Sequence, residues 1–449
     1  MLAFLTRTIL RTFFREIVVE GLEHLPASGP MILTPNHPNG LLDPMLLKDY
    51  SLPFPVRFIA AIFLFRIPVM GWILRRVRAI PVVRHKDAAG EIDYAKFFAA
   101  VVDALAAGDR LVIFPEGVSA SQPYMAPLRT GPARIFFQAR ERGCAPRIVP
   151  VGLNYERGEV FRSSVLISIA PPIDTAPFEA AYRADAAGAV RALTDEIKRV
   201  LDRHVFQSET FRDRKLMLLL DRLYAEQEPR ALSPNSWADR LTRLKRFERG
   251  MARLRETCPE EINRLRHLLA RYRRLSADYG VREKRPRPAP PRSWKIIFLS
   301  LFGSLLAQIG SILNWIPYHA CGRFVWLLKM KEAEAAIFKI LFGMLLYPLA
   351  YGAEGYLLYR WLGPVSAAGF ALAILPLTYF TLKFYEWRRE IGLRPWKVSL
   401  WFAGNTWRRV SHQLARHREQ IVNLVDTLSN RPELRAEADR EARSAAGTS

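Results

Sequence analysis

Short apolar and β-branched runs alternate with segments of helical periodicity over about the first 175 residues. The apolar runs are Ile17–Glu20, Met31–Pro35, Arg57–Ile62, Ala79–Val83, Leu111–Phe114, Arg147–Leu153 and Val165–Ala170. The helical segments between them include Tyr94–Ala107 and Gly131–Arg142. Apolar strands that alternate with helices are typical of a sheet buried on both faces. The pattern therefore predicts an α/β domain with a mostly buried sheet over residues 17–176.

Charged positions with helical spacing follow this region, from residue 177 to residue 281. The clearest helical segments are Val190–Leu201, Arg214–Tyr224, Trp237–Leu254 and Pro259–Tyr279. A proline- and arginine-rich stretch, Lys284–Arg292, comes next, and this composition is typical of a stiff linker. We therefore expect a charged helical extension over 177–281 and a basic linker over 282–293.

Three apolar runs lie beyond the linker, at Ile296–Ile316, Ile337–Tyr359 and Pro364–Tyr385. Each is long enough to cross a bilayer, since a spanning helix needs about 20 apolar residues. All their flanks are basic, and basic flanks favour the cytoplasmic side of a membrane. Three simple crossings would place some of these flanks on the far side. We therefore expect the first run to re-enter, bent near Gly303 or Gly310, and the other two to form a hairpin that turns at Gly363-Pro364.

The same reasoning assigns residues 294–388 to a membrane-embedded region of two or three hydrophobic segments and residues 389–449 to a basic cytoplasmic tail. At the other end of the chain, apolar residues over 1–16 alternate with Arg7, Arg11 and Arg15. This pattern predicts an amphipathic helix that lies on the membrane surface, with packing on the α/β domain as the alternative. The arginines interrupt the apolar run too often for a signal peptide.

The chain is strongly basic, with 66 Lys and Arg against 43 Asp and Glu and a formal net charge of +23 at pH 7. Such a charge fits either nucleic acid or an anionic membrane. Because the charges lie beside apolar runs and no base-stacking module accompanies them, we expect a phospholipid membrane and no nucleic acid as partner. Three scattered cysteines form neither a disulfide framework nor a metal-binding pattern, and we expect no metal.

The segment Asn36–Pro44 directly follows the apolar run Met31–Pro35 and carries a histidine, His37, and an aspartate, Asp43. A carboxylate that binds one ring nitrogen of a histidine fixes the tautomer, and the other nitrogen can then accept a hydroxyl proton. This pair suits a one-step acyl transfer to an alcohol. No serine or cysteine nucleophile is needed when the acyl donor is already a thioester.

Three further blocks follow in order. Ala79–Arg84 is a strand candidate ending in a cation, Phe114–Gly117 leads into a turn with a carboxylate, and Ile148–Gly152 is an apolar strand interrupted by proline. Together with Asn36–Pro44 they resemble, in order and spacing, the four blocks of the glycerol-phosphate acyltransferase superfamily. That superfamily holds the membrane-associated glycerol-3-phosphate and 1-acylglycerol-3-phosphate acyltransferases. The resemblance covers residues 15 to 175 and implies that the α/β domain is an acyltransferase domain.

The resemblance also implies residue roles. His37 would be the general base and Asp43 would orient it, while Arg84 would neutralise the phosphate of the acceptor. The full set of implied substrate-binding residues is Asn36, Arg84, Glu116, Gly117 and Arg129. The implied donor is a fatty acyl thioester, either acyl-CoA or acyl-carrier protein, which is a substrate, and no other cofactor is expected.

Two departures from the usual pattern stand out. Five residues separate His37 from Asp43 where the family usually has four, so the pair would not share a helix face. A loop over Pro38–Gly40 can absorb the extra residue. Val118–Ser121 also replaces the usual threonine and arginine after Phe-Pro-Glu-Gly, which implies that Arg129 takes over some of the phosphate binding. Both departures look closer to the fungal-type glycerol-3-phosphate/dihydroxyacetone-phosphate acyltransferase branch.

The leading hypothesis is an integral membrane O-acyltransferase with its active site on the cytoplasmic face. It would transfer a fatty acyl group from a thioester to the hydroxyl of glycerol 3-phosphate in phospholipid biosynthesis. The alternative acceptor is 1-acylglycerol 3-phosphate or another lysophospholipid. The alternative of another class is a membrane scaffold without turnover. The sequence leaves the oligomeric state and the acyl-chain preference open.

Overall fold

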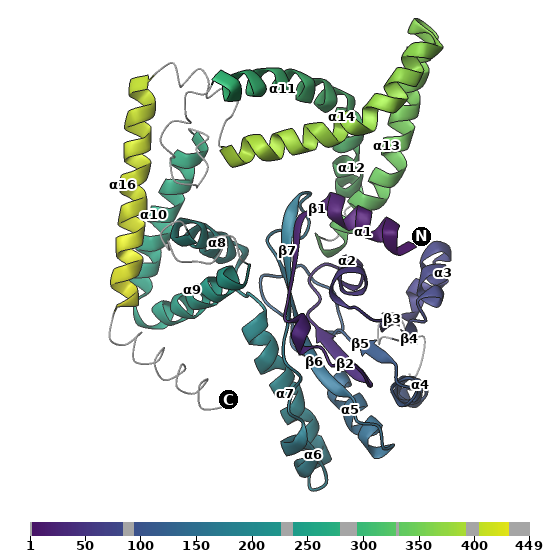
Figure 1. Cartoon of the computed structure of the whole chain (residues 1–449). Coiled ribbons are helices and arrows are strands. Elements are labelled where there is room, and N and C mark those ends of the chain that lie inside the picture. The colour runs from purple at the N-terminus through teal and green to yellow at the C-terminus, as the bar shows by residue number, and fades with distance from the viewer. Residues whose placement is uncertain are drawn as a thin grey trace. The chain divides into compact units, whose positions relative to one another are not determined.

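The structure is a computed structural model that describes residues 2–83, 94–225, 237–278, 294–328, 332–391 and 404–430 (Figure 1). The chain forms two compact units. The first comprises Met1–Phe211 with Lys329–Ile340, and the second comprises Arg212–Leu328 with Leu341–Ser449.

The first unit is built on a seven-stranded sheet in the order β1-β7-β6-β2-β5-β3-β4. Its strands are β1 (Phe14–Glu20), β2 (Met31–Pro35), β3 (Arg57–Ala61), β4 (Ile80–Val82), β5 (Arg110–Val112), β6 (Arg147–Tyr155) and β7 (Ser163–Ile169). Strands β2 to β6 run parallel, whereas β7 is antiparallel to β6 and β1 is parallel to β7. The carboxyl ends of β2 to β6 therefore meet at one edge of the sheet, and those of β1 and β7 lie at the opposite edge. Each of the seven predicted runs overlaps one observed strand.

Helices cover both faces of this sheet. They are α1 (Leu2–Phe13), α2 (Leu42–Leu46), α3 (Pro68–Arg76), α4 (Tyr94–Ala106), α5 (Gly131–Glu141), α6 (Ala176–Tyr182) and α7 (Ala186–His204), with the short helices η1 (Leu22–His24), η2 (Leu47–Ser51) and η3 (Ile62–Arg66). Ile32 packs in a cluster with buried residues of α4, α5 and α7, and its neighbour Leu33 packs in the cluster that holds α1 and α2. Successive strand side chains point to opposite faces, so each face has its own core. This arrangement confirms the predicted α/β domain with a mostly buried sheet.

The first unit extends beyond the predicted domain on both sides. Leu10 and Phe13 of α1 are buried in its core, and β1 begins directly at Phe14. At the other end Leu193 and Leu201 of α7 are fully buried against the sheet. The compact unit therefore ends near residue 211 rather than at 176, because the apolar face of α7 completes the core. The placement of α1 on a membrane surface stays a prediction.

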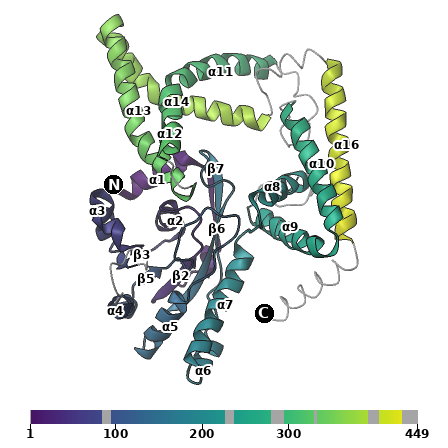
Figure 2. The same ribbon diagram turned by 180° about the vertical axis from the view of Figure 1, so that it is seen from behind.

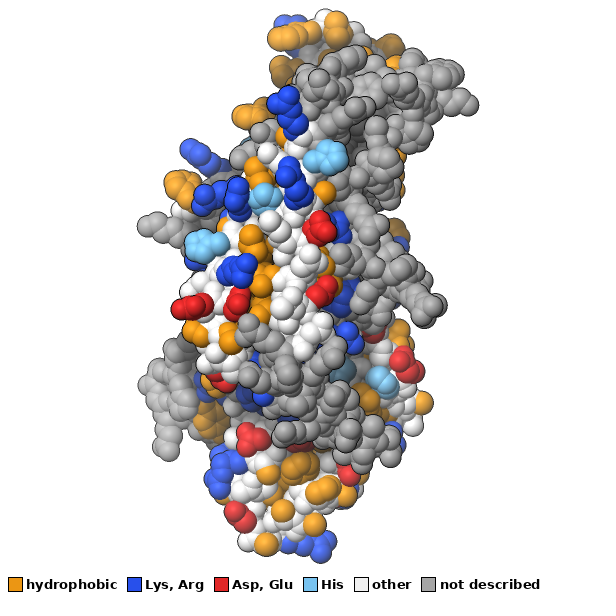
Figure 3. Space-filling view, turned by 90° about the vertical axis from the view of Figure 1, so that its left-hand side faces the viewer, with side chains coloured by type: hydrophobic (Ala, Val, Ile, Leu, Met, Phe, Trp, Pro, Cys, Tyr) orange, Lys and Arg blue, Asp and Glu red, His pale blue; other side chains and the backbone are white. Residues whose placement is uncertain are grey.

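The second unit is helical in its described part. Its helices are α8 (Phe211–Ala225), α9 (Trp237–Thr257), α10 (Pro259–Asp278), α11 (Trp294–Leu313), α12 (Trp315–Leu327), α14 (Pro364–Ile391) and α16 (Gly404–Ser429). Helix α13 (Glu332–Leu362) belongs to the first unit up to Ile340 and to the second unit from Leu341 onward. Helix α16 packs against α10, as both ribbon views show (Figure 2), and the Tyr224 hydroxyl of α8 donates to Asp426 of α16 at 2.7 Å. The segment that the sequence pattern assigned to a basic tail thus contributes a helix to the predicted helical extension. Basic side chains gather on the exposed face of this unit (Figure 3).

Two helices are long and apolar enough to cross a membrane, at Ala335–Leu362 and Pro364–Trp387. They meet at Gly363, whose φ of 82° ends α13, so the predicted turn at Gly363-Pro364 is confirmed. Length and composition alone support this membrane assignment.

Gly303 and Gly310, where a bend was predicted, both lie inside helix α11, so the helix is not interrupted at either glycine and the re-entrant path stays a prediction. A Cβ atom at Gly303 would overlap the Phe384 ring of α14, and one at Gly310 would overlap Thr381. The two glycines therefore permit close packing of α11 on α14. The break in the helix comes at Asn314, between α11 and α12.

Candidate active site

The predicted pair forms at the carboxyl edge of the sheet, in the loop that follows β2. The Nδ1 atom of His37 lies 2.8 Å from Oδ2 of Asp43. Asp43 is in the first turn of α2, and its side chain is fully buried, whereas the His37 side chain is 18% exposed. A buried carboxylate on Nδ1 leaves Nε2 as the nitrogen that can accept a proton.

The extra residue between the two is absorbed in the loop, as expected. Gly40 has a φ of 49°, a left-handed conformation that glycine adopts without strain, and the helix starts only at Leu42. The backbone N–H of Asn39 also donates to Oδ2 of Asp43 at 2.9 Å. The turn therefore brings His37 and Asp43 together although they would not share a helix face.

A third side chain completes the surroundings of Asp43. The hydroxyl of Tyr155, at the end of β6, donates to Oδ1 of Asp43 at 2.5 Å. Burial and the charge of Asp43 raise the pKa of Tyr155 well above its ordinary value, so the hydroxyl keeps its proton. Tyr155 is not among the predicted site residues. Pro35 pairs with Val151, so β6 continues past the end of β2 and brings Tyr155 to the edge where Asp43 lies, and this register has no local signal in the sequence.

The imidazole of His37 is held on one face by an aromatic ring. Its centroid lies 3.8 Å from that of Phe114, with the planes at 18°. Phe114 follows β5, which neighbours β2 in the sheet. The stacking leaves the ring little freedom to rotate, so the proton-accepting nitrogen has a defined direction. Within the described residues, no protein hydrogen bond occupies that nitrogen.

Glu116 supports the backbone of the site. Its Oε1 accepts the N–H of His37 at 2.7 Å, and its Oε2 accepts the N–H of Ala126 at 2.8 Å. Burial raises the pKa of Glu116, and the two backbone N–H groups oppose that rise. Both oxygens of this predicted substrate-binding residue therefore have protein partners that fix the loop carrying His37.

Gly117 and Arg129, two other predicted substrate-binding residues, lie against each other. Gly117 has a φ of 66°, and a Cβ there would come 2.7 Å from Nε of Arg129. The N–H of Arg129 donates to the Pro115 carbonyl at 2.8 Å, while its side chain is exposed. The structure thus brings a solvent-facing guanidinium to the turn that holds Glu116.

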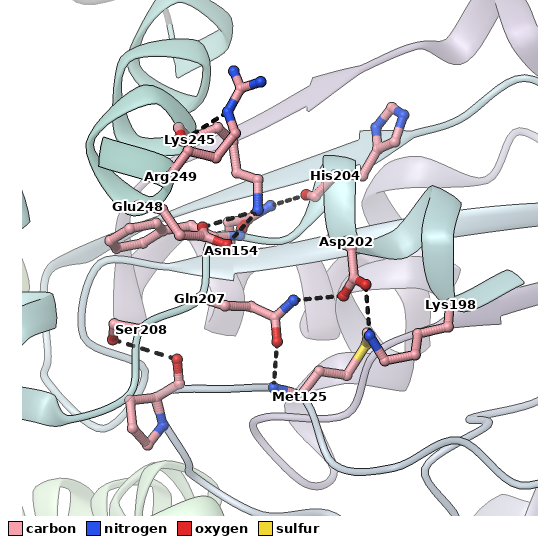
Figure 4. Close-up of polar contacts among 12 residues, drawn as sticks. Met125, Asn154, Lys198, Asp202, His204, Gln207, Ser208, Lys245, Glu248 and Arg249 are labelled. Carbon is pink, nitrogen blue, oxygen red and sulfur yellow. Dashed lines mark hydrogen bonds and ion pairs between the residues drawn. The ribbon is translucent and has the colours of Figure 1, made fainter. Parts of the chain in front are cut away.

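A polar network stabilises the segment between that turn and α5 (Figure 4). Gln207 accepts the N–H of Met125 at 2.9 Å and donates to Asp202 at 2.8 Å, and Asp202 also binds Lys198. These contacts hold the residue next to Ala126, whose N–H binds Glu116. The C-terminal end of α7 and Gln207 therefore help to fix the backbone that binds Glu116.

Asn36 and Arg84 are the remaining two predicted substrate-binding residues, and the structure describes only the first of them. The amide nitrogen of Asn36 donates to the Leu153 carbonyl at 3.1 Å, and its oxygen accepts the Leu153 N–H at 2.6 Å. Asn36 is buried and joins the end of β2 to β6, so these contacts describe a structural role, while substrate binding stays a prediction. Arg84 lies outside the described residues.

Among the residues that the structure describes, no group of three or more His, Cys, Asp or Glu could hold a metal ion.

The family model for Acyltransferase matches residues 16–154, a range that contains both His37 and Asp43. Two curated chloroplastic proteins are similar to this part of the chain. The 1-acyl-sn-glycerol-3-phosphate acyltransferase LPAT1 of Arabidopsis thaliana is 30% identical over 31% of this chain and 36% of its own length. The 1-acyl-sn-glycerol-3-phosphate acyltransferase BAT2 of Brassica napus is 29% identical over 26% of this chain and 33% of its own length.

The crystal structure of PlsC, the 1-acyl-sn-glycerophosphate acyltransferase of Thermotoga maritima, is also similar. It has a TM-score of 0.33 and 20% identity, over 44% of this chain and 75% of that chain. The matched region spans only about a third of the length of these curated relatives: 36% of LPAT1 and 33% of BAT2. Residues 16–154 are an acyltransferase domain of the glycerol-phosphate acyltransferase superfamily. The assignment to the fungal-type branch stays a prediction.

Proposed function

We propose that this protein is a membrane-bound O-acyltransferase that moves a fatty acyl group from a thioester to the hydroxyl of glycerol 3-phosphate. The observation that carries the proposal is the His37–Asp43 pair, with Asp43 buried and Nε2 of His37 directed away from it. The acyl donor is acyl-CoA or acyl-carrier protein. The product would enter phospholipid synthesis.

The chemistry follows from this geometry. Nε2 of His37 accepts the proton of the acceptor hydroxyl while the hydroxyl oxygen attacks the thioester carbonyl carbon. A C–O bond forms and the C–S bond breaks, and the proton held by His37 passes to the leaving thiolate. The products are an ester and a free thiol. A positioned general base of this kind contributes about 10²- to 10⁴-fold in rate.

Arg129 is the described cation that we assign to the acceptor phosphate, because its side chain is exposed beside Gly117. A guanidinium binds phosphate oxygens in a fork geometry. Arg84 would be the second cation, as the resemblance implies. Replacing Arg129 by alanine should raise the KM for the phosphate-bearing acceptor and leave the KM for the thioester unchanged.

The alternative acceptor is 1-acylglycerol 3-phosphate. It is favoured by the activity named for the two similar chloroplastic proteins, which are 1-acyl-sn-glycerol-3-phosphate acyltransferases. The five-residue spacing between His37 and Asp43 favours glycerol 3-phosphate instead, through the fungal-type resemblance. The size of the pocket that binds the acceptor would distinguish glycerol 3-phosphate from 1-acylglycerol 3-phosphate.

We also propose that the protein is integral to a membrane and that its active site is on the cytoplasmic face. Two apolar helices, Ala335–Leu362 and Pro364–Trp387, support the first statement by length and composition. Basic residues flank them in the sequence, which supports the second. Protease or cysteine accessibility of the Arg323–Lys331 flank tests the orientation, because exposure on the far face would contradict it.

The experiment is acyl transfer by the purified, detergent-solubilised full chain with a labelled acyl thioester. Glycerol 3-phosphate, dihydroxyacetone phosphate and 1-acylglycerol 3-phosphate are offered separately. Product with one acceptor, lost in His37→Ala and kept in His267→Ala, supports the mechanism and identifies the acceptor. His267 is an exposed histidine on α10 and serves as the matched control. A folded protein that forms no product with any acceptor favours the scaffold without turnover.

A further inference from the structure

Helix α3 follows the short helix η3 and presents large apolar side chains to solvent. Trp72 is 59% exposed and Ile67, just before the helix, is 46% exposed. Exposed tryptophan and isoleucine side chains cost free energy in water unless something covers them. These residues lie outside the active-site chemistry described above.

The other side of the same helix is firmly attached to the first unit. Leu74 is buried in the core, and Met70 packs against it. Gly71 lies so close to the Phe65 carbonyl that a Cβ there would overlap it. The helix is therefore held in one orientation, and the exposure of Trp72 is a fixed property of the surface.

The exposed apolar residues are surrounded by positive charge. Arg66, Arg75 and Arg76 are exposed, and the whole stretch from Arg57 to Val83 contains no aspartate or glutamate. An amphipathic helix with tryptophan on one side and arginines beside it is typical of segments that lie in the headgroup layer of a bilayer. Anionic headgroups would complement the arginines.

The position of the helix relative to the site comes from the sheet. Strand β3 leads directly into η3 and runs parallel to β5, which runs parallel to β2. The segment after β3 therefore starts at the same edge of the sheet as His37. A surface at that edge is where an acyl chain would pass between the site and a bilayer.

We propose that Arg66, Ile67, Trp72, Arg75 and Arg76, here called the α3 surface, seat the acyltransferase domain on the headgroup layer of an anionic phospholipid bilayer. The aromatic and aliphatic side chains enter the boundary between headgroups and acyl chains, and the arginines bind the phosphates. The inference concerns contact with lipid and does not depend on which acceptor is acylated.

The experiment measures the depth of a spin label in the full chain reconstituted into nanodiscs. Cys144, Cys258 and Cys321 are first replaced by serine, and a single cysteine is introduced as Trp72→Cys. The matched control is Leu22→Cys, because Leu22 is 45% exposed and follows β1, whose carboxyl end lies at the opposite edge of the sheet. Accessibility to oxygen and to a water-soluble nickel chelate is compared in discs of phosphatidylglycerol and of phosphatidylcholine.

In phosphatidylglycerol discs, the label at position 72 should be several-fold less accessible to the nickel chelate than the label at position 22, with oxygen accessibility raised. Arg75→Glu with Arg76→Glu should return the label at 72 toward water and leave the label at 22 unchanged. A label at 72 that is as accessible to nickel as the label at 22 overturns the proposal. Low accessibility to both reagents also overturns it, since that is the signature of a protein contact.

Two further controls keep the test decisive. Ile67→Cys repeats the measurement at a second position if Trp72→Cys is poorly folded. Acyl transfer is measured in parallel with the unlabelled cysteine-free chain. Loss of that activity with the lipid contact intact would count against the proposed function alone, because the depth measurement requires no turnover.

Discussion

Asp43 of the first unit and Asp213 of the second unit are both buried carboxylates, but their partners differ. The side chain of Asp43 is fully buried, and its described partners are the Asn39 N–H, the Tyr155 hydroxyl and the His37 imidazole. Asp213 of the second unit is equally buried, but its partners are two arginines.

The two arginines are Arg255 of α9 and Arg266 of α10, at 3.2 and 2.8 Å from Asp213. A second carboxylate of α8, Asp221, is paired with Arg240 and Arg243 in the same way. Opposite charges neutralise these carboxylates and join the helices. In the proposed mechanism the Asp43 carboxylate faces the imidazole of His37, the one group that becomes positive when it accepts the hydroxyl proton. We therefore expect the partners of a buried carboxylate, rather than its burial, to distinguish a catalytic role from a structural one.

The largest expected effect comes from removing the charge of Asp43. In Asp43→Asn an amide NH₂ group replaces one carboxylate oxygen and must face a donor of His37, Asn39 or Tyr155. Where it faces His37, it favours the imidazole tautomer with the proton on Nε2, and this tautomer cannot accept the hydroxyl proton there. We expect acyl transfer to fall by about 10²- to 10⁴-fold, as for loss of a general base. Initial rates measure the effect, and a thermal melt close to that of the wild type shows that the fold is retained. A variant with full activity would contradict the assigned role.

The second effect is on stability and concerns the other kind of carboxylate. Asp213→Ala leaves two arginines without their partner, and we expect a loss of about 3 kcal/mol in the free energy of unfolding, the low end for a broken buried pair. The low end applies because Arg255 and Arg266 are each 27% exposed and can reach water. Denaturant unfolding in detergent measures it.

The matched control is Glu260→Ala, an exposed glutamate in the first turn of α10, where we expect a change within about 0.5 kcal/mol. The acyl-transfer rate per folded molecule should stay unchanged in Asp213→Ala. If Asp213→Ala were stable but inactive, Asp213 would be needed for activity rather than for stability, and this result would contradict the proposed difference between Asp43 and Asp213.

A smaller effect is expected for Tyr155→Phe, which removes one neutral donor from Asp43. A hydrogen bond to a charged group contributes about 1.5–3 kcal/mol, so we expect the rate to fall by about 10- to 100-fold. The uncompensated charge of Asp43 would stabilise the imidazolium of His37. The acid limb of the pH–rate profile should therefore move to higher pH.

Tyr182→Phe is the matched control, because the Tyr182 hydroxyl binds Glu141 at 3.0 Å on α5, outside the site. Its pH–rate profile should be that of the wild type. The raised pKa of Tyr155 means that its own ionisation contributes nothing to the profile near neutral pH. An acid limb that does not move in Tyr155→Phe would show that the tyrosine acts only on the fold.

The smallest expected effect is on the pH dependence of stability and concerns Glu116. Its pKa is raised by burial, so the contribution of Glu116 to stability is fully present below its unfolded pKa and is lost as the pH rises through its folded pKa. Glu116→Gln does not titrate. The stability of the wild type relative to this variant should therefore decline as the pH rises from about 4.5, the ordinary glutamate pKa, through the mildly acidic range. Unfolding at a series of pH values measures the difference.

Much of the fold could be read from local pattern. The apolar run Met31–Pro35 became β2 with the same bounds, and the predicted turn at Gly363-Pro364 separates α13 from α14. The sequence pattern also predicts His37 and Asp43 as a pair, and Nδ1 of His37 lies 2.8 Å from Oδ2 of Asp43. These predictions succeed because strand periodicity, turn chemistry and a short loop between two partners act over a few residues.

Contacts between distant residues could not be read in the same way. Tyr155 meets Asp43 across 112 positions, and Arg418 of α16 donates to the Leu223 carbonyl of α8 across 195. Gly310 looked like a hinge and is a packing position against α14. Each of these depends on which strand or helix lies next to which, and a glycine or a tyrosine has the same local signal in either setting.

The sequence by itself therefore determined the α/β class, the two long apolar helices on either side of Gly363, and the pairing of His37 with Asp43. Only the tertiary structure decided that Tyr155 and Asn39 hold Asp43, that Glu116 fixes the His37 loop, and that α16 belongs to the helical unit. The physical reason is the distance along the chain between the residues that determine each feature. Periodicity and loop length are properties of neighbouring residues, whereas the partners of a buried charge are set by strand register and helix packing across the whole chain.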